Sequence, residues 1–181
     1  MISKKIFFII FLQFSLFANS VYNINFLDFQ AKVFPKIILL DNNFEDKLLE
    51  NSVVLTILYE EIDYSAVEIL KDKIEKEYKS LKDYNLKVNS LKYSEFNRNK
   101  LSTAYILLLG KDEKILEISK ILSSNSRLTF AYDNSYLDLG VIFGLSITSK
   151  VDILLNIEAL KNSKIELQNS IFSVVKIRWE I

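Results

Sequence analysis

Short apolar runs recur along this chain between polar segments, and their composition is typical of buried strands. The runs Val53–Tyr59 and Thr103–Leu109 are apolar almost throughout and rich in β-branched or aromatic residues. A short run without alternation predicts a strand whose two faces are both covered. Leu86–Tyr93 instead alternates apolar and polar residues, which predicts an edge strand with one face in water.

The densest group of strands is predicted in the last third of the chain, and the other elements are organised around it. Three apolar runs follow one another there, at Arg127–Tyr132, Val141–Ile147 and Val151–Leu155. Only Thr148-Ser149-Lys150 separates the second run from the third, which is a hairpin-length polar break. We therefore expect an antiparallel hairpin near the C-terminus of the chain.

Helical spacing of apolar residues predicts two helices in the first half of the chain. The first covers Tyr22–Leu40, and Pro35, the only proline, predicts a kink or a stop because it has no amide to bond the preceding turn. The second covers Tyr64–Lys82 and shows one clear apolar stripe. Asp63 precedes it in the position of a helix cap.

Three further helices are predicted in the second half. Asp112–Ser123 begins with acidic residues, which suit the positive end of a helix dipole. Asn156–Asn162 is long enough for one helical turn. A final helix is predicted next, because Ser163 and Glu166 have the spacing of a capping box. Its apolar face would consist of Leu167, Ile171, Val174 and Val175.

The order of these elements predicts an α/β fold. A helix is followed by two strand–helix–strand units, a hairpin and a last helix; the crossovers require parallel strands and the hairpin adds an antiparallel pair. We expect a three-layer sandwich with a mixed, mostly parallel sheet, a C-terminal antiparallel hairpin and a final helix. Residues 21–181 have the length of one domain and contain no linker-like segment.

Residues 1–20 have the pattern of a secretory signal peptide. Lys4-Lys5 precedes the apolar run Ile6–Phe17, and Ala18-Asn19-Ser20 places small residues where a signal peptidase reads them. A retained membrane anchor is the alternative, although this almost wholly apolar run of 12 residues falls short of the roughly 20 that span a bilayer. We predict cleavage before Val21 and a periplasmic protein.

Composition limits the chemistry that the chain can perform. The sequence contains no His and no Cys, which excludes Ser–His and Cys–His catalysis, thiolate or imidazole metal sites, and disulfides. The formal net charge is zero and Lys alternates with Glu, so no basic stripe suggests a nucleic-acid partner. We predict a protein without cofactor or metal that is not an enzyme.

Polar and aromatic residues follow two of the predicted strands. Glu60 and Asp63 come after the strand at 53–59, and Asp133 and Tyr136 come after the strand at 127–132. The carboxyl ends of parallel strands form the edge at which open α/β sheets bind ligands. These residues either contact a ligand there, with paired carboxylates able to hold Mg²⁺ or Ca²⁺, or serve as helix caps, solvated loops and core.

Four segments together resemble one known family. Leu139–Ile142 is a glycine-led strand, Ile153–Ala159 is a short strand ending in Asn before an Ala-containing turn, and Ile171–Ile177 matches a final apolar helix. Phe29–Pro35 matches an opening helix that closes at a proline. On these segments the chain resembles the YfiR-like family of small periplasmic proteins. The cysteines that give some members a redox response are absent here, so the resemblance implies no redox switch.

The resemblance implies a regulatory role. Family members restrain the sensory domain of an inner-membrane signalling protein until a signal releases them. We therefore predict a non-enzymatic periplasmic regulator in cyclic-di-GMP signalling, whose partner is a diguanylate cyclase or a sensor kinase, with a homodimer as a further assembly. The alternative is a periplasmic module that binds a small-molecule ligand. Asn156 is the matched polar residue, and it either contacts a ligand or partner or caps the turn after its strand.

Overall fold

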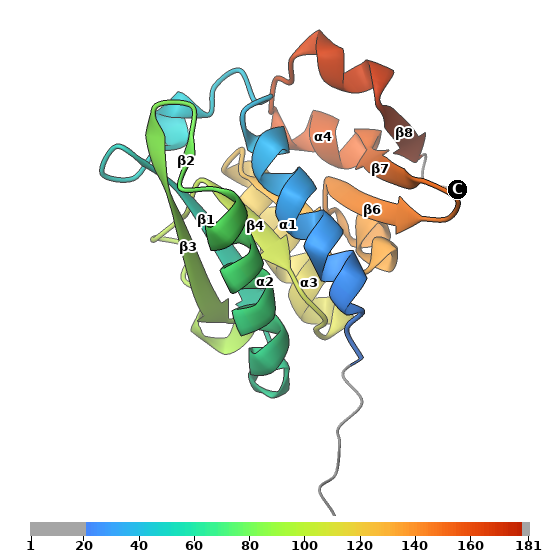
Figure 1. The fold of residues 1–181 in the computed structure, drawn as a ribbon. Helices are drawn as coiled ribbons and strands as arrows, with labels where there is room; N and C mark the ends of the chain where they lie inside the picture. The colour runs from blue at the N-terminus through green and yellow to red at the C-terminus, as the bar shows by residue number, and fades with distance from the viewer. Residues whose placement is uncertain (1–20, 179–181) are drawn as a thin grey trace, which may run out of the picture.

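A computed structural model of the chain describes residues 21–178, which form one eight-stranded sheet with helices on both faces (Figure 1). The signal peptide predicted over residues 1–20 lies outside the described residues, as do residues 179–181. Within residues 21–178, no helix is long and apolar enough to cross a membrane.

The sheet is mixed and mostly parallel. Its strands are β1 (Ser52–Tyr59), β2 (Ser80–Leu81), β3 (Tyr84–Lys92), β4 (Ala104–Leu107), β5 (Leu128–Ala131), β6 (Phe143–Ile147), β7 (Val151–Asn156) and β8 (Val175–Arg178), in the spatial order β2-β3-β1-β4-β5-β6-β7-β8. Only β2–β3 and β6–β7 pair antiparallel; the other neighbours are parallel. The predicted fold class and the C-terminal hairpin are therefore confirmed.

Helices form layers on the two faces of the sheet. α1 (Ile24–Ile38) and α2 (Tyr64–Glu77) lie side by side in front of the sheet in Figure 1, and α3 (Asp112–Ser124) lies behind it. A short α4 (Ile157–Ser163) follows β7 and contacts α3. The helices predicted over these four regions are present, although their ends differ in part.

The central strands β1, β4 and β5 are buried throughout because both faces of the sheet are covered. Successive side chains of a strand point to opposite faces. Along β1, Leu55 and Ile57 belong to the core under α1 and α2, whereas Leu58 belongs to the core under α3. Phe34 of α1 stacks on Phe130 of β5 with ring centroids 4.6 Å apart. These contacts fix α1 across the centre of the sheet.

The two helices of the first half end differently from their predictions. α1 ends at Ile38, close to the predicted Leu40; it does not stop at Pro35, and a kink there stays a prediction. Proline removes one amide bond near the helix end, and burial of the following turn against the sheet offsets that loss. α2 ends at Glu77 rather than at residue 82, since Ser80–Leu81 forms a hairpin with β3 and buries Leu81. Lys82, at φ 51°, makes the turn.

The final helix predicted after Ser163 is also wrong. Ser163 ends α4 and its hydroxyl donates to the carbonyl of Leu160, so it does not begin a new helix. A 3₁₀ turn at Asn169–Ser173 and then β8 take its place, with β8 parallel to β7. The apolar residues there fit a helical spacing, but Val175 and Ile177 also fit the two-residue period of a strand, and pairing with β7 decides between them.

Candidate functional site

The carboxyl edge of the sheet contains a crevice of the kind that binds ligands in open α/β proteins. After β1 the chain forms β3 on one side, then returns to form β4 on the other side of β1. This reversal of strand order leaves a crevice outside the ends of β1 and β4, at the topological switch point. The crevice is bordered on one side by Tyr59 and Glu60, at the end of β1, and on the other side by residues 108–110, which follow β4.

Tyrosine side chains of the protein itself occupy this switch point. They come from the segment before α1, from the turn after β3 and from the turn after β5. Their hydroxyls satisfy the backbone after β4, which would otherwise need a ligand or water. The hydrogen bonds join Tyr93 Oη to the Leu108 carbonyl (2.6 Å), the Leu109 amide to Tyr22 Oη (2.9 Å), and Tyr136 Oη to both the amide (2.8 Å) and the carbonyl (3.1 Å) of Gly110.

The tyrosine hydroxyls remain protonated in this environment. Burial raises the pKa of Tyr22, Tyr93 and Tyr136, because an ionised phenol loses its hydration inside the protein. Burial also raises the pKa of Asp63; the charge of Glu60 acts in the same direction and a hydrogen bond with Tyr22 opposes it. The switch point is thus filled by neutral tyrosine hydroxyls, next to the carboxyl group of Asp63.

Four of the five predicted site residues lie at this edge. Asp63 contacts Tyr22 and occupies the cap position of α2, although its side chain makes no capping hydrogen bond. Glu60 lies close enough to act electrostatically on Asp63, and Tyr136 is buried in the core under α3. Asp133 caps the 3₁₀ turn after β5 through the amide of Ser135 (2.8 Å). Among the described residues, no three acidic side chains are grouped to hold a metal ion.

Asn156, the fifth predicted residue, lies at the opposite edge of the sheet. β7 runs antiparallel to β6, so its last residue meets the start of β6, where the Asn156 amide donates to the Ile142 carbonyl (2.9 Å). The buried side chain donates from Nδ2 to the Leu137 carbonyl (2.6 Å) and accepts at Oδ1 from the Ala159 amide (2.9 Å). The structure therefore shows Asn156 in the capping role, at the start of α4.

A hollow of about 670 Å³ lies beside the switch point, between the start of α1 and the ends of β5 and β6. We call it the α1–β6 hollow. It is the open part of the carboxyl edge, and Asp133 is the predicted site residue on its wall. Its lining residues are Asn23, Asn25, Phe26, Phe29, Tyr132, Asp133, Asn134, Leu145, Ser146 and Ile147.

Aromatic surfaces and hydrogen-bond acceptors meet in the α1–β6 hollow. Phe26 and Tyr132 pack edge to face, with ring centroids 5.2 Å apart. Asn134 donates from Nδ2 to the Leu145 carbonyl (2.8 Å), while its Oδ1 is buried without a hydrogen-bond partner in the described part of the chain. A buried acceptor of this kind is normally satisfied by a donor from the protein or by a water. Gly144 permits this placement, because a Cβ there would lie 2.5 Å from Asn134 Oδ1.

No protein-family model and no curated protein matches the chain, but solved structures do. A conserved domain protein from Vibrio cholerae has a TM-score of 0.56 and 12% identity, over 85% of this chain and 60% of that chain. An ABC domain from Streptococcus pneumoniae, solved with L-Trp, has a TM-score of 0.50 and 10% identity, over 78% of this chain and 62% of that one. The shared feature is the fold. The chain spans about three fifths of the length of each, and membership of the YfiR-like family stays a prediction.

Most of the residues that line the α1–β6 hollow were not predicted from the sequence. Asn134 directly follows Asp133, so its place after β5 was a usable signal. Phe26 and Phe29 gave no such signal, because they belong to an amphipathic helix and only the position of α1 over β5 and β6 makes them part of a wall. Tyr132 ends the strand predicted at 127–132, and it contributes a half-buried ring to the hollow.

Proposed function

We propose that this chain is a non-enzymatic module that binds a small molecule in the α1–β6 hollow. The observation that carries the proposal is the combination, at the ligand-binding edge of an open α/β sheet, of aromatic surface with the carboxylate of Asp133 and with one acceptor, Asn134 Oδ1, that has no hydrogen-bond partner among the described residues. The fold similarity to a domain solved with L-Trp supports the same function.

The lining of the hollow favours a ligand with an apolar or aromatic body and an amine. Phe26, Phe29 and Tyr132 offer ring faces to an apolar or cationic group. Asp133 offers a carboxylate on the rim, and Asn134 Oδ1 offers a buried acceptor. An aromatic amino acid has the complementary groups, because its ammonium donates to such acceptors and its side chain stacks on such rings.

Binding without catalysis is part of the proposal. The sequence lacks His and Cys, and the tyrosines at the switch point have raised pKa values and donate to, or accept from, the backbone. They are therefore poor proton acceptors near neutral pH. The predicted leader adds a periplasmic location, where such a module would sample external metabolites.

The test is a ligand panel against the protein expressed as the full chain. Thermal unfolding and calorimetry with the twenty amino acids, L-Trp included, should reveal a saturable ligand with an aromatic body. Asp133→Asn keeps a good capping residue and removes the charge, so affinity should fall roughly tenfold or more. Asp83→Asn is the matched control, because Asp83 is exposed and lies outside the hollow. Absence of any aromatic ligand, or equal loss in both variants, would refute the proposal.

We also propose a more specific function, which is control of a membrane-bound partner protein. We infer that the module restrains the sensory domain of an inner-membrane signalling protein, a diguanylate cyclase or a sensor kinase, and that its ligand alters this contact. The sequence resemblance is the basis of this proposal. Support comes from the surface formed by β8, the last strand in the sheet order of the described residues, and the 3₁₀ turn before it, where Ile177 of β8 and the preceding Phe172 and Val174 are exposed.

A pull-down with a surface variant tests this finer function. The tagged full-chain protein should recover one membrane cyclase or sensor kinase from detergent-solubilised membranes of its host. Val174→Lys should lose that protein, because it places a charge on the apolar surface, whereas Lys120→Gln on α3 should retain it. Recovery of the same proteins by both variants would exclude this surface as the contact. If the wild-type protein instead runs at the size of a dimer in solution, a second copy of the chain covers this surface.

A further inference from the structure

A second hollow, of about 760 Å³, lies at the edge of the sheet opposite to the α1–β6 hollow. We call it the amino-edge hollow, because it lies beside the starts of β1, β4 and β5. It is built from separate stretches of the chain. Its lining residues are Leu49, Glu50, Val54, Lys87, Asn89, Arg98, Asn99, Lys100, Leu101, Ser102, Asn125 and Arg127.

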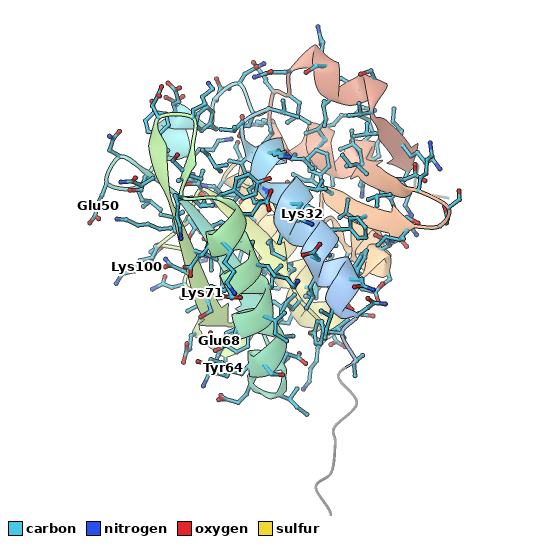
Figure 2. The ribbon with its side chains drawn as sticks, in the orientation of Figure 1. Lys32, Glu50, Tyr64, Glu68, Lys71 and Lys100 are labelled. Carbon is cyan, nitrogen blue, oxygen red and sulfur yellow. The ribbon has the colours of Figure 1, made fainter. Side chains whose placement is uncertain are left out.

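The amino-edge hollow is strongly basic although the whole chain has no net charge. Four cationic side chains line it and a single acidic side chain opposes them. That acid, Glu50, lies 3.3 Å from Lys87, and both side chains are largely exposed, so the pair neutralises little of the field. Figure 2 shows Glu50 and Lys100 projecting from the same side of the molecule. The remaining cations are Arg98, Lys100 and Arg127.

The guanidinium of Arg127 is only partly satisfied by the described residues. Arg127 is half-buried and lines the hollow, and its Nε and Nη1 are buried without a hydrogen-bond partner in the described part of the chain. Burial lowers the pKa of Arg127, but a guanidinium stays charged at neutral pH. A buried charge without a partner is costly, so proteins normally supply one.

The groups that act on Arg127 electrostatically are already engaged elsewhere. Asp41 is buried, forms an ion pair with Lys47 and accepts a hydrogen bond from the amide of Asn43 (3.0 Å). The hydroxyl of Tyr105 accepts from the amide of Ser102 (2.6 Å). The described chain therefore offers the guanidinium only the charge of Asp41, which is shared with Lys47, and the hollow next to it is open to solvent.

We propose that the amino-edge hollow binds a small molecule that carries oxyanion groups, phosphate or carboxylate, and that Arg127 anchors one of them. A guanidinium binds oxyanions through charge-assisted hydrogen bonds. Arg98 and Lys100, exposed on the loop before β4, add positive charge to the hollow, and the side-chain amides of Asn89 and Asn99 supply neutral donors. The volume exceeds that of a single phosphate, so the ligand has more than one polar group.

This site is independent of the proposed function at the α1–β6 hollow, because it lies at the other edge of the sheet and shares no residue with it. The test uses pyrophosphate and citrate as probes, each against sodium chloride at matched ionic strength. At a hundredfold excess over Kd, either probe should raise the unfolding temperature of the full-chain protein by about 5 to 10 °C. The tighter probe identifies the oxyanion class.

Three variants make the test specific. Arg127→Met should lower probe affinity roughly tenfold to hundredfold, and without anion it should unfold no earlier than the wild type, since it removes a buried charge that is only partly paired. Arg98→Gln together with Lys100→Gln should also weaken binding, and these exposed positions leave folding unchanged. Lys71→Gln, on α2 and outside the hollow (Figure 2), is the matched control.

Either of two results would overturn the inference. One is stabilisation by pyrophosphate and citrate that does not exceed that of sodium chloride. The other is that the double variant at Arg98 and Lys100 and the Lys71→Gln control both bind the probes as tightly as the wild type. Neither result affects amine binding at the α1–β6 hollow, which responds to Asp133→Asn.

Discussion

Asn156 is a polar residue whose side chain serves the fold. All of its described contacts are internal, to the carbonyl of Leu137 and to the amide of Ala159. A polar residue that ends a strand and precedes a helix has the position of a cap, so this role was visible in the sequence. The contact with Leu137 was not, because it joins turns that only the folded sheet brings together.

Replacing Asn156 should therefore destabilise the protein. Asn156→Ala removes the cap of α4 and leaves the buried Leu137 carbonyl without its donor, which together should cost about 2 to 4 kcal/mol. Denaturant unfolding measures this loss. Asn162→Ala, at an exposed position of the same helix, should stay within about 0.5 kcal/mol of the wild type. Similar values for both variants would show that the cap contributes little.

At the scale of elements, periodicity predicted the strands in the centre of the sheet and failed near its margins. Central strands such as β1 and β4 are buried on both faces, so their sequences have only one interpretation. β8 is different, because its exposed and half-buried residues fit a strand and a helix equally well. Pairing with β7 selects the strand, and that partner is not visible in a local window of sequence.

An ion pair between Asp152 of β7 and Lys176 of β8 helps to hold the last strand. Their side-chain atoms are 2.6 Å apart, and Lys150 lies 3.5 Å away on the other side. The hydrogen bond from Lys176 is the main cause that lowers the pKa of Asp152. A carboxyl with a lowered pKa in the folded state stabilises the protein above its ordinary pKa of about 4 and loses this contribution as the pH falls.

Asp152→Asn should consequently change how the free energy of unfolding depends on pH in the acid range. The wild type should lose stability more steeply than the variant as the pH is lowered from 5 to about 3. Denaturant unfolding at a series of pH values measures the difference, with Asp72→Asn as a control for an exposed pair on α2. Parallel curves for wild type and Asp152→Asn would mean that the pair does not contribute.

At the scale of the whole molecule, the segment before α1 closes the switch point. Tyr22 packs on Tyr132, with ring centroids 4.6 Å apart, and its hydroxyl accepts from the Leu109 amide. The Asn23 amide donates to the hydroxyl of Tyr132 (2.8 Å), which holds the start of α1 against the end of β5. The crevice at the switch point is therefore filled, and the neighbouring α1–β6 hollow is the place where we propose that a ligand binds.

Removing Tyr22 should open this edge. Tyr22→Ala should cost about 3 to 5 kcal/mol of unfolding free energy, as for other large buried aromatic residues. Tyr22→Phe should cost about 1 to 3 kcal/mol, because it leaves the Leu109 amide without its acceptor. Hydrogen exchange at the Leu109 amide should accelerate in both variants, while exchange in α3 rises only with the global loss of stability. Unchanged exchange at Leu109 in Tyr22→Phe would contradict the role of the hydroxyl.

Folding also brings four cations together at one edge of the molecule. They line the amino-edge hollow with a single acid, Glu50. The sequence shows Lys and Glu alternating with no basic stripe, since the cations that meet at the hollow are up to forty positions apart (residues 87 to 127). Folding therefore produces an anion-attracting surface that composition does not reveal.

By itself the sequence determined the fold class, the central strands, the hairpin and the edge at which Glu60, Asp63, Asp133 and Tyr136 lie. These features follow from local periodicity and from the rule that parallel strands end together. Only the tertiary structure decided that tyrosines close the switch point, that α1 forms the wall of a hollow, and that two guanidinium nitrogens of Arg127 are buried without a hydrogen-bond partner among the described residues. Each of these depends on packing between segments distant in sequence, which no local pattern specifies.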